Sequence, residues 1–410
     1  SSLPLDVAGS AAAAYGLRNL SSSYSGNVVE VRRSSDDTTQ NFTAAEITDG
    51  TLLAFVNAIP TLDVASNFTL SGQSYETFTN ASNSGFSITN SDTGARGGFG
   101  GVTGISGDVL SVSFDLNIIS GSPRLILSEY NTTNTRSNAI IYNESGSFTS
   151  TFTATGDFNF ITFTEGDIPA EWTISNFKIT AIQSNGFVKT WYDQSGNSNN
   201  ATQATAASQP KIVSAGALVT GGLDFDGSDD FLTNNTAIMN NAANAYASVV
   251  LSRTSTTSNE IPLSFPADSA GNRGFDLRLS SGTTSQLSIR TSAGSSNASG
   301  SFATASGSNV LLTGTFNAGL SSDEAKFFGN GSLVGSASNS GSGLINNGDN
   351  GGLFIGRFGS PTNFGAHLNG KVEEVIVYTS DQSDKRRAIE ESIATANGIT
   401  LGSFSRDGFV

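Results

Sequence analysis

The stretch Leu110–Ile118, LSVSFDLNI, decides the fold class of this chain. Apolar and polar residues alternate along its whole length, so an extended backbone places all of its apolar side chains on one face. These side chains are Leu110, Val112, Phe114, Leu116 and Ile118. Alternation with a period of two predicts a β-strand that is buried on one side.

The same period recurs along the rest of the chain. Phe148–Phe152, Phe158–Phe163 and Trp172–Ile179 alternate in the same way, with Gly-containing segments between them. Further strands are expected at Asn27–Arg33, Phe187–Tyr192, Ala247–Arg253, Phe275–Leu279, Gln286–Arg290, Val310–Phe316, Ala325–Phe328, Leu353–Gly356 and Lys371–Tyr378. Many short strands joined by turns predict an all-β protein built from sandwiches or jelly rolls.

Helix signals are few. Ser383–Asn397 carries Ile389 and Ile393 on one face and is followed by Gly398, so it is predicted as a single C-terminal helix that ends at this glycine. Ala11–Leu20 has helical propensity and is expected as a helix or turn before the first strand.

Composition supports a folded extracellular protein and excludes several function classes. The 410 residues include 46 glycines and 27 phenylalanines, and 37% are hydrophobic, which is too apolar for a disordered chain. The net charge of −15 disfavours nucleic acid as a partner. No apolar run reaches the length of a membrane span, and the N-terminus lacks the pattern of a signal peptide. With no cysteine and one histidine, thiol catalysis and zinc–thiolate sites are excluded.

Two separated motifs carry a family resemblance. LDFDGSDDFL at 223–232 and LFIGRFGSPTNFGAHLNGKVEEVIVY at 353–378 resemble the laminin-G/concanavalin-like jelly-roll superfamily. The segments 14–43 and 187–203 resemble the catalytic sandwich of family-54 α-L-arabinofuranosidases, and more closely phage and marine-bacterial proteins with the same motifs. The Phe-rich segment between them resembles carbohydrate-binding jelly-roll modules. We therefore expect a concanavalin-like sandwich, residues 1–56 plus 186–410, with a second β-sandwich, residues 57–185, inserted in a surface loop.

The arabinofuranosidase resemblance does not carry the enzyme's chemistry with it. A retaining glycosidase needs two carboxylates about 5–5.5 Å apart. In that family the acid follows the strand that corresponds to Leu353–Gly356, whereas this chain continues with Arg357-Phe358-Gly359 and has no carboxylate there. The resemblance therefore predicts a retained fold without catalytic residues, with hydrolysis kept as an alternative.

Sugar contacts are expected in the loop between the last two confident strands. Arg357, Phe358, Asn363, Phe364 and His367 combine a guanidinium, two aromatic rings, an amide and an imidazole in a Gly- and Pro-containing loop. Loops on rigid sandwiches carry binding residues. The alternative is that both phenylalanines pack under the loop, and the sequence favours neither interpretation over the other.

Four aspartates crowd the stretch Leu223–Leu232, which is predicted as two strand pieces around an Asp226-Gly227 hairpin-type turn. Asp224, Asp226 and Asp229 are the candidate ligands for Ca²⁺, since this ion takes oxygen ligands. The alternative, an ordinary acidic turn with no metal, is favoured, so no cofactor is otherwise predicted.

Three aromatic positions remain. Tyr130 and Tyr142 fall at strand ends outside the alternating Phe series, and they are candidate surface contacts for sugar, with edge packing as the alternative. Trp191 lies in an alternating strand and is predicted to be core, and Asp193 is predicted to cap the polar turn that follows it.

These observations predict a phage virion surface protein, such as a fibre, tail or capsid-decoration component. It would bind host-surface polysaccharide weakly and at many sites, contact other virion proteins and form a homo-oligomer, a trimer if the assembly is fibrous. The expected location is the virion surface or extracellular space. The alternatives are a secreted bacterial glycoside hydrolase of arabinofuranosidase type and a purely architectural virion protein.

Overall fold

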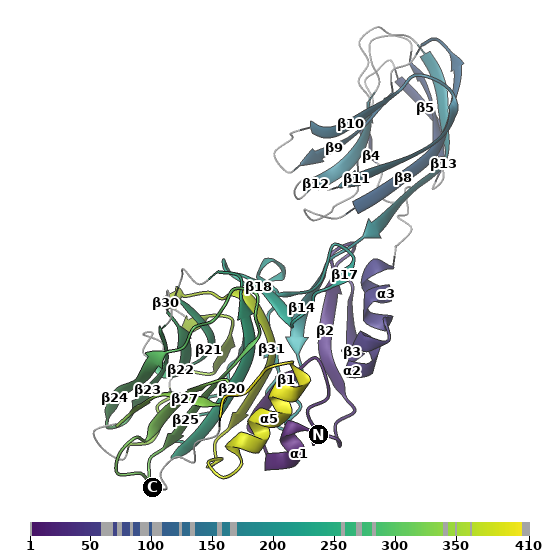
Figure 1. Cartoon of the computed structure of the whole chain (residues 1–410). Coiled ribbons are helices and arrows are strands. Elements are labelled where there is room, and N and C mark those ends of the chain that lie inside the picture. The colour runs from purple at the N-terminus through teal and green to yellow at the C-terminus, as the bar shows by residue number, and fades with distance from the viewer. Residues whose placement is uncertain are drawn as a thin grey trace.

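The structure is a computed structural model of the 410-residue chain. It describes residues 2–58, 69–71, 76–82, 85–90, 98–100, 109–122, 125–131, 136–153, 158–164, 170–255, 259–267, 273–280, 284–338, 343–348, 351–360 and 363–403. Strands dominate this part of the chain (Figure 1). The prediction of an all-β protein is confirmed for this part of the chain.

One continuous ladder of antiparallel strands forms the larger body. Its strands are β1 (Ala13–Gly16), β2 (Asn27–Arg33), β3 (Thr39–Thr43), β14 (Gly186–Trp191), β15 (Ala201–Thr202), β16 (Lys211–Ser214), β17 (Ala217–Leu218), β18 (Leu223–Asp226), β19 (Leu232–Asn234), β20 (Asn244–Arg253), β21 (Glu260–Pro266), β22 (Arg273–Leu279), β23 (Thr284–Thr291), β24 (Gly294–Ser301), β25 (Val310–Asn317), β26 (Ala325–Gly329), β27 (Ser332–Ala337), β28 (Leu353–Ile355) and β31 (Asn369–Tyr378). The ladder curls so that two faces enclose one apolar interior.

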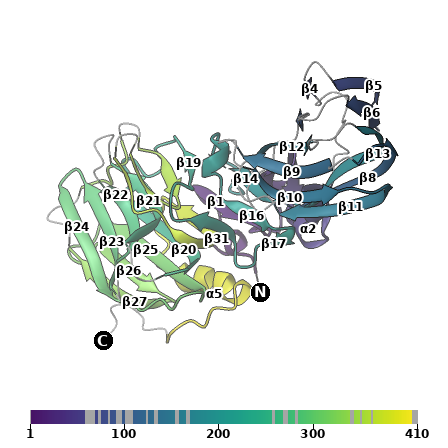
Figure 2. The same cartoon turned by 90° about the horizontal axis from the view of Figure 1, so that it is seen from above.

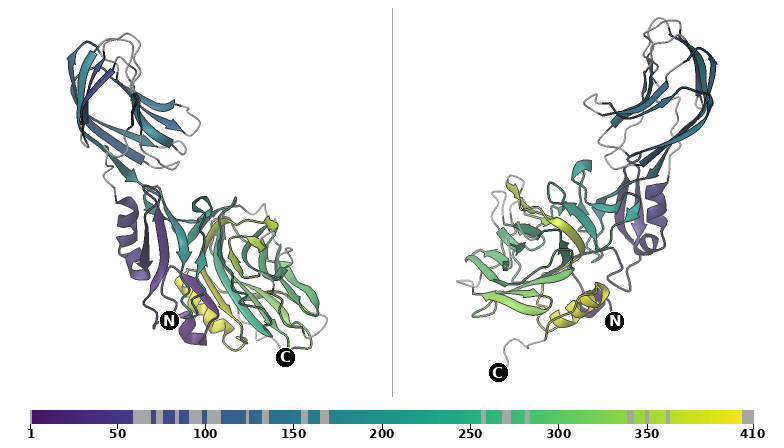
Figure 3. Two further views of the ribbon diagram at one scale, coloured as in Figure 1. Left: turned by 180° about the vertical axis from the view of Figure 1, so that it is seen from behind. Right: turned by 45° about the horizontal axis from the view of Figure 1, so that its top comes forward.

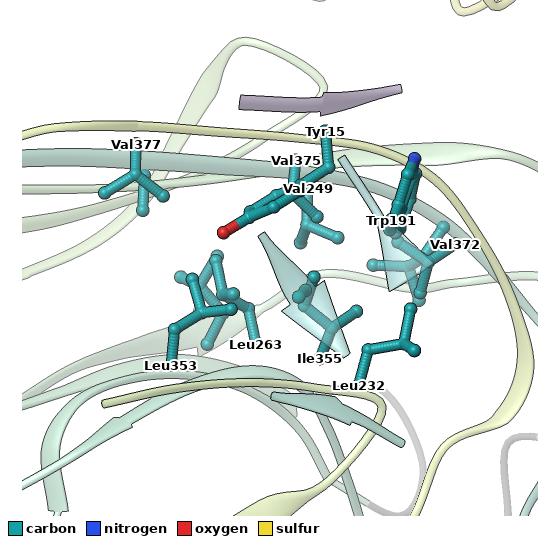
Figure 4. Close-up of a cluster of buried hydrophobic side chains, with 14 of the residues drawn as sticks. Tyr15, Trp191, Leu232, Val249, Leu263, Leu353, Ile355, Val372, Val375 and Val377 are labelled. Carbon is teal, nitrogen blue, oxygen red and sulfur yellow. The ribbon is translucent and has the colours of Figure 1, made fainter. Parts of the chain in front are cut away.

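The interior is the reason for the alternating pattern. Figure 4 shows Val249, Val375 and Val377 from β20 and β31 facing Leu263, Leu353 and Ile355 from β21 and β28. These side chains are fully buried or nearly so. Tyr15 and Trp191 fill the space beside them, with their ring centroids 5.8 Å apart. Burial of such area is the main favourable contribution to folding.

A second, smaller apolar cluster lies on the outer face of the same layer. There α1 (Pro4–Ala8) and α5 (Arg386–Ala396) cover β20 and β31 (Figure 1), and Figure 2 shows α5 from above beside these strands. Ile389 and Ile393 of α5 are buried in this cluster, and Gly398 ends the helical segment with a φ of 64°. The predicted C-terminal helix is thereby confirmed, although it starts at Arg386 and not at Ser383.

The expectation of a single helix is wrong for the described residues. Besides α1 and α5 they contain α2 (Ala44–Thr48), α3 (Thr51–Asn57) and a 3₁₀ turn at Ala206–Ser208. At the start of α2, Thr43 Oγ1 accepts the Glu46 N–H and the Glu46 carboxylate accepts the Thr43 N–H. This reciprocal cap supports a helix too short for apolar periodicity to reveal.

The expectation of a helix or turn at Ala11–Leu20 is also wrong for its central part. Ala13–Gly16 is the strand β1, which pairs antiparallel with Glu374–Val377 of β31. All four residues of β1 are buried. The backbone bonds to β31 and the burial of Tyr15 outweigh the small helical preference of alanine.

The middle segment forms its own sheets. They contain β4 (Thr69–Ser71), β5 (Glu76–Ser82), β6 (Gly85–Asn90), β7 (Gly98–Gly100), β8 (Val109–Ser120), β9 (Leu125–Asn131), β10 (Arg136–Tyr142), β11 (Gly146–Thr153), β12 (Phe158–Thr164) and β13 (Ala170–Gln183). A five-stranded sheet has the order β11-β8-β13-β6-β5, and a three-stranded sheet has the order β10-β9-β12. In β8, Val112, Phe114 and Leu116 are buried, as their alternation predicts.

The two ends of this segment meet on the larger body (Figure 3). A Cβ on Gly186 would lie 2.9 Å from Cγ2 of Val56, so the entering and leaving chains touch. Nearby, Ser34 N donates to the Asn185 carbonyl at 2.9 Å, which ties the exit to β2. This contact meets the geometric requirement of an inserted segment. The boundaries of the two domains, 1–56 plus 186–410 and 57–185, stay a prediction.

Candidate binding site at the rim of the sandwich

The candidate site begins at the turn that follows β18. Asp226 ends that strand, and its Oδ1 accepts the Ser228 N–H at 2.8 Å and the Asp229 N–H at 3.3 Å. Gly227 between them has a φ of 79°, in the left-handed region that glycine occupies without strain. The turn therefore leaves the side chains of Asp226 and Asp229 exposed at one edge of the sandwich. We call this edge, formed by residues 226–231 and 354–367, the rim.

The predicted strand pieces at this turn exist, but they do not form a hairpin. β18 pairs with β16 and β31, whereas β19 pairs with β15 and β28. The two strands therefore lead away to different neighbours, and the turn between them stands at the edge of the sandwich. An Asp-Gly pair fixes the backbone of a turn but not the partners of its flanking strands.

A second segment reaches the same rim from β28. Gly356 follows this strand with a φ of 90°, and a Cβ at this position would lie 2.4 Å from the Phe225 ring. Its N–H donates to the Pro262 carbonyl, and its carbonyl accepts the Leu368 N–H at 2.8 Å. This close approach turns the chain so that Arg357 comes to lie against the first segment.

Arg357 stacks on aromatic rings of both segments. Its guanidinium carbon lies 3.4 Å from the centroid of the Phe231 ring and 5.2 Å from that of Phe354. The side chain is 7% exposed, and burial lowers the pKa of Arg357 to about 10. The group therefore stays charged at neutral pH, where it provides a cation held between rings.

His367 lies close enough to Arg357, Asp226 and Asp229 for their charges to change its pKa. Its pKa is lowered from the ordinary value mainly by partial burial and then by the charge of Arg357, while Asp226 and Asp229 act in the opposite direction. The imidazole is consequently neutral at pH 7 and offers one donor and one acceptor.

The carboxylates beside this histidine form a trio that differs from the predicted one. Ligand oxygens of Asp226, Asp229 and Asp230 lie within 4.8 Å of one another. Asp230 is buried, its Oδ2 accepts the Asp226 N–H at 3.0 Å, and burial together with the charge of Asp226 raises the pKa of Asp230 to about 7. Three carboxylates at this spacing suit the oxygen preference of Ca²⁺, which takes six to eight ligands.

Asp224 is not a member of this trio. It lies in the middle of β18, where its cross-strand neighbours are Lys211 and Lys371. Burial raises the pKa of Asp224, and the charges of the two lysines oppose this effect. Asp224 therefore faces two lysines and lies outside the group of Asp226, Asp229 and Asp230, and its part in binding a metal stays a prediction.

The remaining predicted loop residues form a small hairpin. β29 (Phe358–Ser360) pairs with β30 (Asn363–Gly365), and Gly359 stands opposite Phe364. Phe358 is half-buried. The side chains of Asn363 and Phe364 lie outside the described residues, so their part in sugar binding stays a prediction.

The two tyrosines of the middle segment do not belong to this rim. Tyr142 is 7% exposed, with its ring centroid 5.0 Å from Phe114 and 4.7 Å from Phe148, and its hydroxyl bonds to Ser150. The expectation of an exposed ring at Tyr142 is therefore not met, because the ring closes the gap between two sheets. Tyr130 lies in β9, and its side chain is outside the described residues.

The motif around Trp191 is structural. Trp191 is fully buried, as predicted. The carboxylate of Asp193 accepts the N–H groups of Ala14, Ser195 and Asn199 at 2.8–2.9 Å and the Ser195 hydroxyl at 2.7 Å. The predicted cap of the turn is thus confirmed, and the same carboxylate also fastens β1 to the turn.

The rim therefore unites Arg357, His367, Asp226 and Asp229, four of the predicted residues. It also contains Asp230, the fourth aspartate of the crowded stretch, and Phe231 and Phe354, which the sequence did not single out. Carboxylates and a neutral imidazole bind hydroxyl groups, and partly exposed rings supply apolar contact. No signal in the sequence marks Phe231 as the partner of Arg357, because 126 positions along the chain separate them.

Comparison with known families places the rim inside a recognised domain. Residues 225–385 match the family model described as the concanavalin A-like lectin/glucanases superfamily. This range contains the turn at Asp226 and the segment from Arg357 to His367. No curated protein sequence matches the chain.

Solved structures give weaker similarities. The carbohydrate-binding module CBM40 of the Ruminococcus gnavus IT-sialidase, bound to α2,3-sialyllactose, is 13% identical, with a TM-score of 0.31 over 37% of this chain and 83% of that one. A heptameric SAP-like pentraxin from Limulus polyphemus is 15% identical, with a TM-score of 0.29 over 40% and 78% of the two chains. The CBM22-1 xylan-binding domain of Paenibacillus barcinonensis Xyn10C is 10% identical, with a TM-score of 0.23 over 31% and 96%. These values are too low to identify a functional counterpart.

Proposed function

We propose that this chain, residues 225–385 of which form a concanavalin A-like domain, is a glycan-binding protein that holds sugar hydroxyls at the rim described above. One observation carries the proposal. Two segments more than 100 residues apart bring exposed carboxylates, a neutral imidazole and a ring-stacked guanidinium to one place. The superfamily's own description includes lectins, which agrees with this chemistry.

Sugar binding uses these groups directly. Asp226 and Asp229 accept hydrogen bonds from vicinal hydroxyls, and His367 adds a donor or an acceptor. Phe231 and Phe358 are partly exposed and supply apolar contact to the less polar face of a sugar ring. A Ca²⁺ ion held by Asp226, Asp229 and Asp230 would bind the oxygen atoms of the same sugar hydroxyls as additional ligands.

The test is a glycan array of plant, animal and bacterial surface polysaccharides, followed by calorimetry with the glycan that binds best. We expect Asp226→Asn and His367→Ala each to weaken binding about tenfold, which corresponds to about 1.4 kcal/mol. Asp49→Asn is the matched control, since Asp49 is also exposed and its Oδ1 also accepts the N–H two residues ahead.

If Asp226→Asn, His367→Ala and the control all bind the glycan with the affinity of the wild type, the glycan does not bind at this rim and the proposal is wrong. Release of arabinose from arabinan by the wild-type protein would favour the hydrolase alternative. We propose binding without turnover, because the position after β28 where the resembling enzymes have their acid is occupied by Arg357.

We further propose that the protein serves on the surface of a phage particle, where several copies bind host polysaccharide together. This part rests on the resemblance of residues 14–43 and 187–203 to phage proteins, and on a chain without cysteine. None of the described helices is long and apolar enough to cross a membrane. Imaging of the intact assembly tests this assignment, and a position in its interior would contradict it.

A further inference from the structure

The middle segment has an open sheet edge at β11. This strand is the last one of the five-stranded sheet β11-β8-β13-β6-β5 (Figure 2), and all eight of its residues pair with β8 in one unbroken register. Among the residues that the structure describes, no strand pairs with the other side of β11. The backbone N–H and C=O groups on that side can therefore hydrogen-bond to a further strand.

Other edges of these sheets are protected against such pairing, but β11 is not. Proteins usually protect an edge strand with a charged residue, a proline or a break in register. β5, the opposite edge of the same sheet, begins with Glu76 and has an interrupted register. β10, an edge of the three-stranded sheet, begins with Arg136 and is interrupted as well. β11 has no charged residue, no proline and no interruption, so it is the least protected of the three edges.

The sequence of β11 is complementary to itself. Its central residues Phe148–Phe152, FTSTF, read the same in both directions. Two antiparallel copies centred on Ser150 therefore place Phe148 of each copy opposite Phe152 of the other. They also place Thr149 opposite Thr151. Directly opposite residues of an antiparallel pair lie on the same face, where aromatic pairs and threonine pairs stabilise a sheet.

Exposure and charge also favour a second copy as the partner of this edge. Ser147, Thr149 and Thr151 are exposed along the strand. The chain has a net charge of −15, so two copies repel each other wherever their acidic surfaces meet. An uncharged strand at a sheet edge lets the two copies approach with the least repulsion.

We infer that two copies of this chain associate by antiparallel pairing of β11 with β11 about a two-fold axis at Ser150. The pairing joins their five-stranded sheets into one continuous sheet. A two-fold contact uses the same residues of both copies, which is what a palindromic strand provides. The inference concerns the middle segment alone and does not depend on glycan binding at the rim.

The corner at the start of β11 adds apolar surface to this contact. Ile119 is 53% exposed and Ile141 is 47% exposed. Ser145 Oγ accepts the Ile118 N–H at 2.8 Å, which places the end of β8 beside the turn between β10 and β11. A second copy paired along β11 lies beside this corner and covers part of it, which favours association.

Analytical ultracentrifugation of the full chain measures the association. The contact is smaller than a standard stable interface, so we expect a monomer–dimer equilibrium with a Kd on the order of 10–100 µM. In Thr149→Lys/Thr151→Lys the pairing places lysines of the two copies opposite each other, and the Kd should rise at least about tenfold. An equimolar mixture of this variant with Thr149→Glu/Thr151→Glu should associate again, as a heterodimer.

A matched control separates the contact from a general effect of added charge. Ser295 and Asn297 are also exposed and stand two positions apart on β24 of the larger body. Ser295→Lys/Asn297→Lys should therefore leave the Kd unchanged. All of these variants should keep the melting temperature of the wild type, because the replaced side chains are exposed.

Cysteine cross-linking tests the register of the pairing. The wild-type chain has no cysteine, so a single substitution gives an unambiguous product. In Ser150→Cys the two sulfurs meet at the axis, with Cα atoms about 4.5–5.5 Å apart, and mild oxidation should link the copies into a covalent dimer. Ser147→Cys is the control, because the pairing places this position opposite Thr153 and separates its two copies by about 20 Å.

A chain that stays monomeric at ten times the expected Kd would overturn the inference, as would a trimer, since two-fold pairing uses the edges in pairs. A dimer that Thr149→Lys/Thr151→Lys leaves unchanged, or equal cross-linking of both cysteine variants, would also overturn it. His367→Ala at the rim should leave association unchanged. A monomeric protein that binds glycan would refute only this inference, and a dimer of the expected register that binds no glycan would refute only the proposed function.

Discussion

Replacing Asp193 by alanine should destabilise the larger sandwich more than any exposed substitution. The carboxylate accepts four hydrogen bonds, and one of them comes from the fully buried N–H of Ala14 in β1. In Asp193→Ala this N–H has neither protein nor water as a partner, at a cost of about 2 kcal/mol. The half-buried N–H groups of Ser195 and Asn199 can bond to water and lose about 1 kcal/mol each.

The total expected loss is therefore about 4 kcal/mol in the free energy of unfolding. Asp193→Asn should lose about half as much, because its amide oxygen still accepts the Ala14 and Ser195 N–H groups while its NH₂ opposes the Asn199 N–H. The order of stability is wild type, then Asp193→Asn, then Asp193→Ala.

Urea unfolding followed by tryptophan fluorescence measures this order. In a Trp172→Phe background the sole remaining tryptophan is Trp191, which is fully buried two residues before Asp193. Asp49→Ala serves as the control, since this exposed carboxylate accepts the Thr51 N–H at 2.9 Å in a turn open to water and its loss should change stability little. If Asp193→Ala costs no more than this control, the carboxylate does not fasten β1 and the reasoning is refuted.

Two predictions concern titration at the rim. His367 is the single histidine of the chain, so NMR can follow its ring protons directly; its pKa should lie below 6.5, and Asp226→Asn should lower it further by removing a neighbouring negative charge. A pKa at or above 6.5, or a rise in the variant, would contradict the described geometry. In chelator-containing buffer, Asp230→Asn should leave the free energy of unfolding unchanged near pH 4 and raise it at pH 8 by up to about 4 kcal/mol. The reason is that the pKa of Asp230 rises to about 7 on folding, so the folded state disfavours the charged carboxylate above pH 4. Equal stability differences at pH 4 and pH 8 would show that burial does not perturb Asp230.

Local sequence determined which residues form strands and which of their faces is buried. In LSVSFDLNI the alternation gave β8 and its buried Val112, Phe114 and Leu116, since successive side chains of an extended backbone point to opposite sides. The same reasoning gave β31 and the helix that ends before Gly398.

Tertiary structure decided the partners. Ala13–Gly16 became a strand because β31 offered an edge and Asp193 accepted the Ala14 N–H, neither of which a propensity can register. The strands β18 and β19, on either side of the turn at Asp226, pair with different strands, β31 and β28. The sequence could not predict this, since alternation determines which face of a strand is buried but not which strand lies beside it.

The rim shows the same division. The residue types at Asp226, Arg357 and His367 could be selected from the sequence, because charged and aromatic groups in turns are those that bind ligands. The sequence could not predict that these residues lie together. It also could not predict that Arg357 stacks on Phe231 or that Asp230 accepts the Asp226 N–H. Those contacts depend on β18 and β28 ending at the same rim, and strand order across a curled sheet is set by long-range pairing that no local pattern encodes.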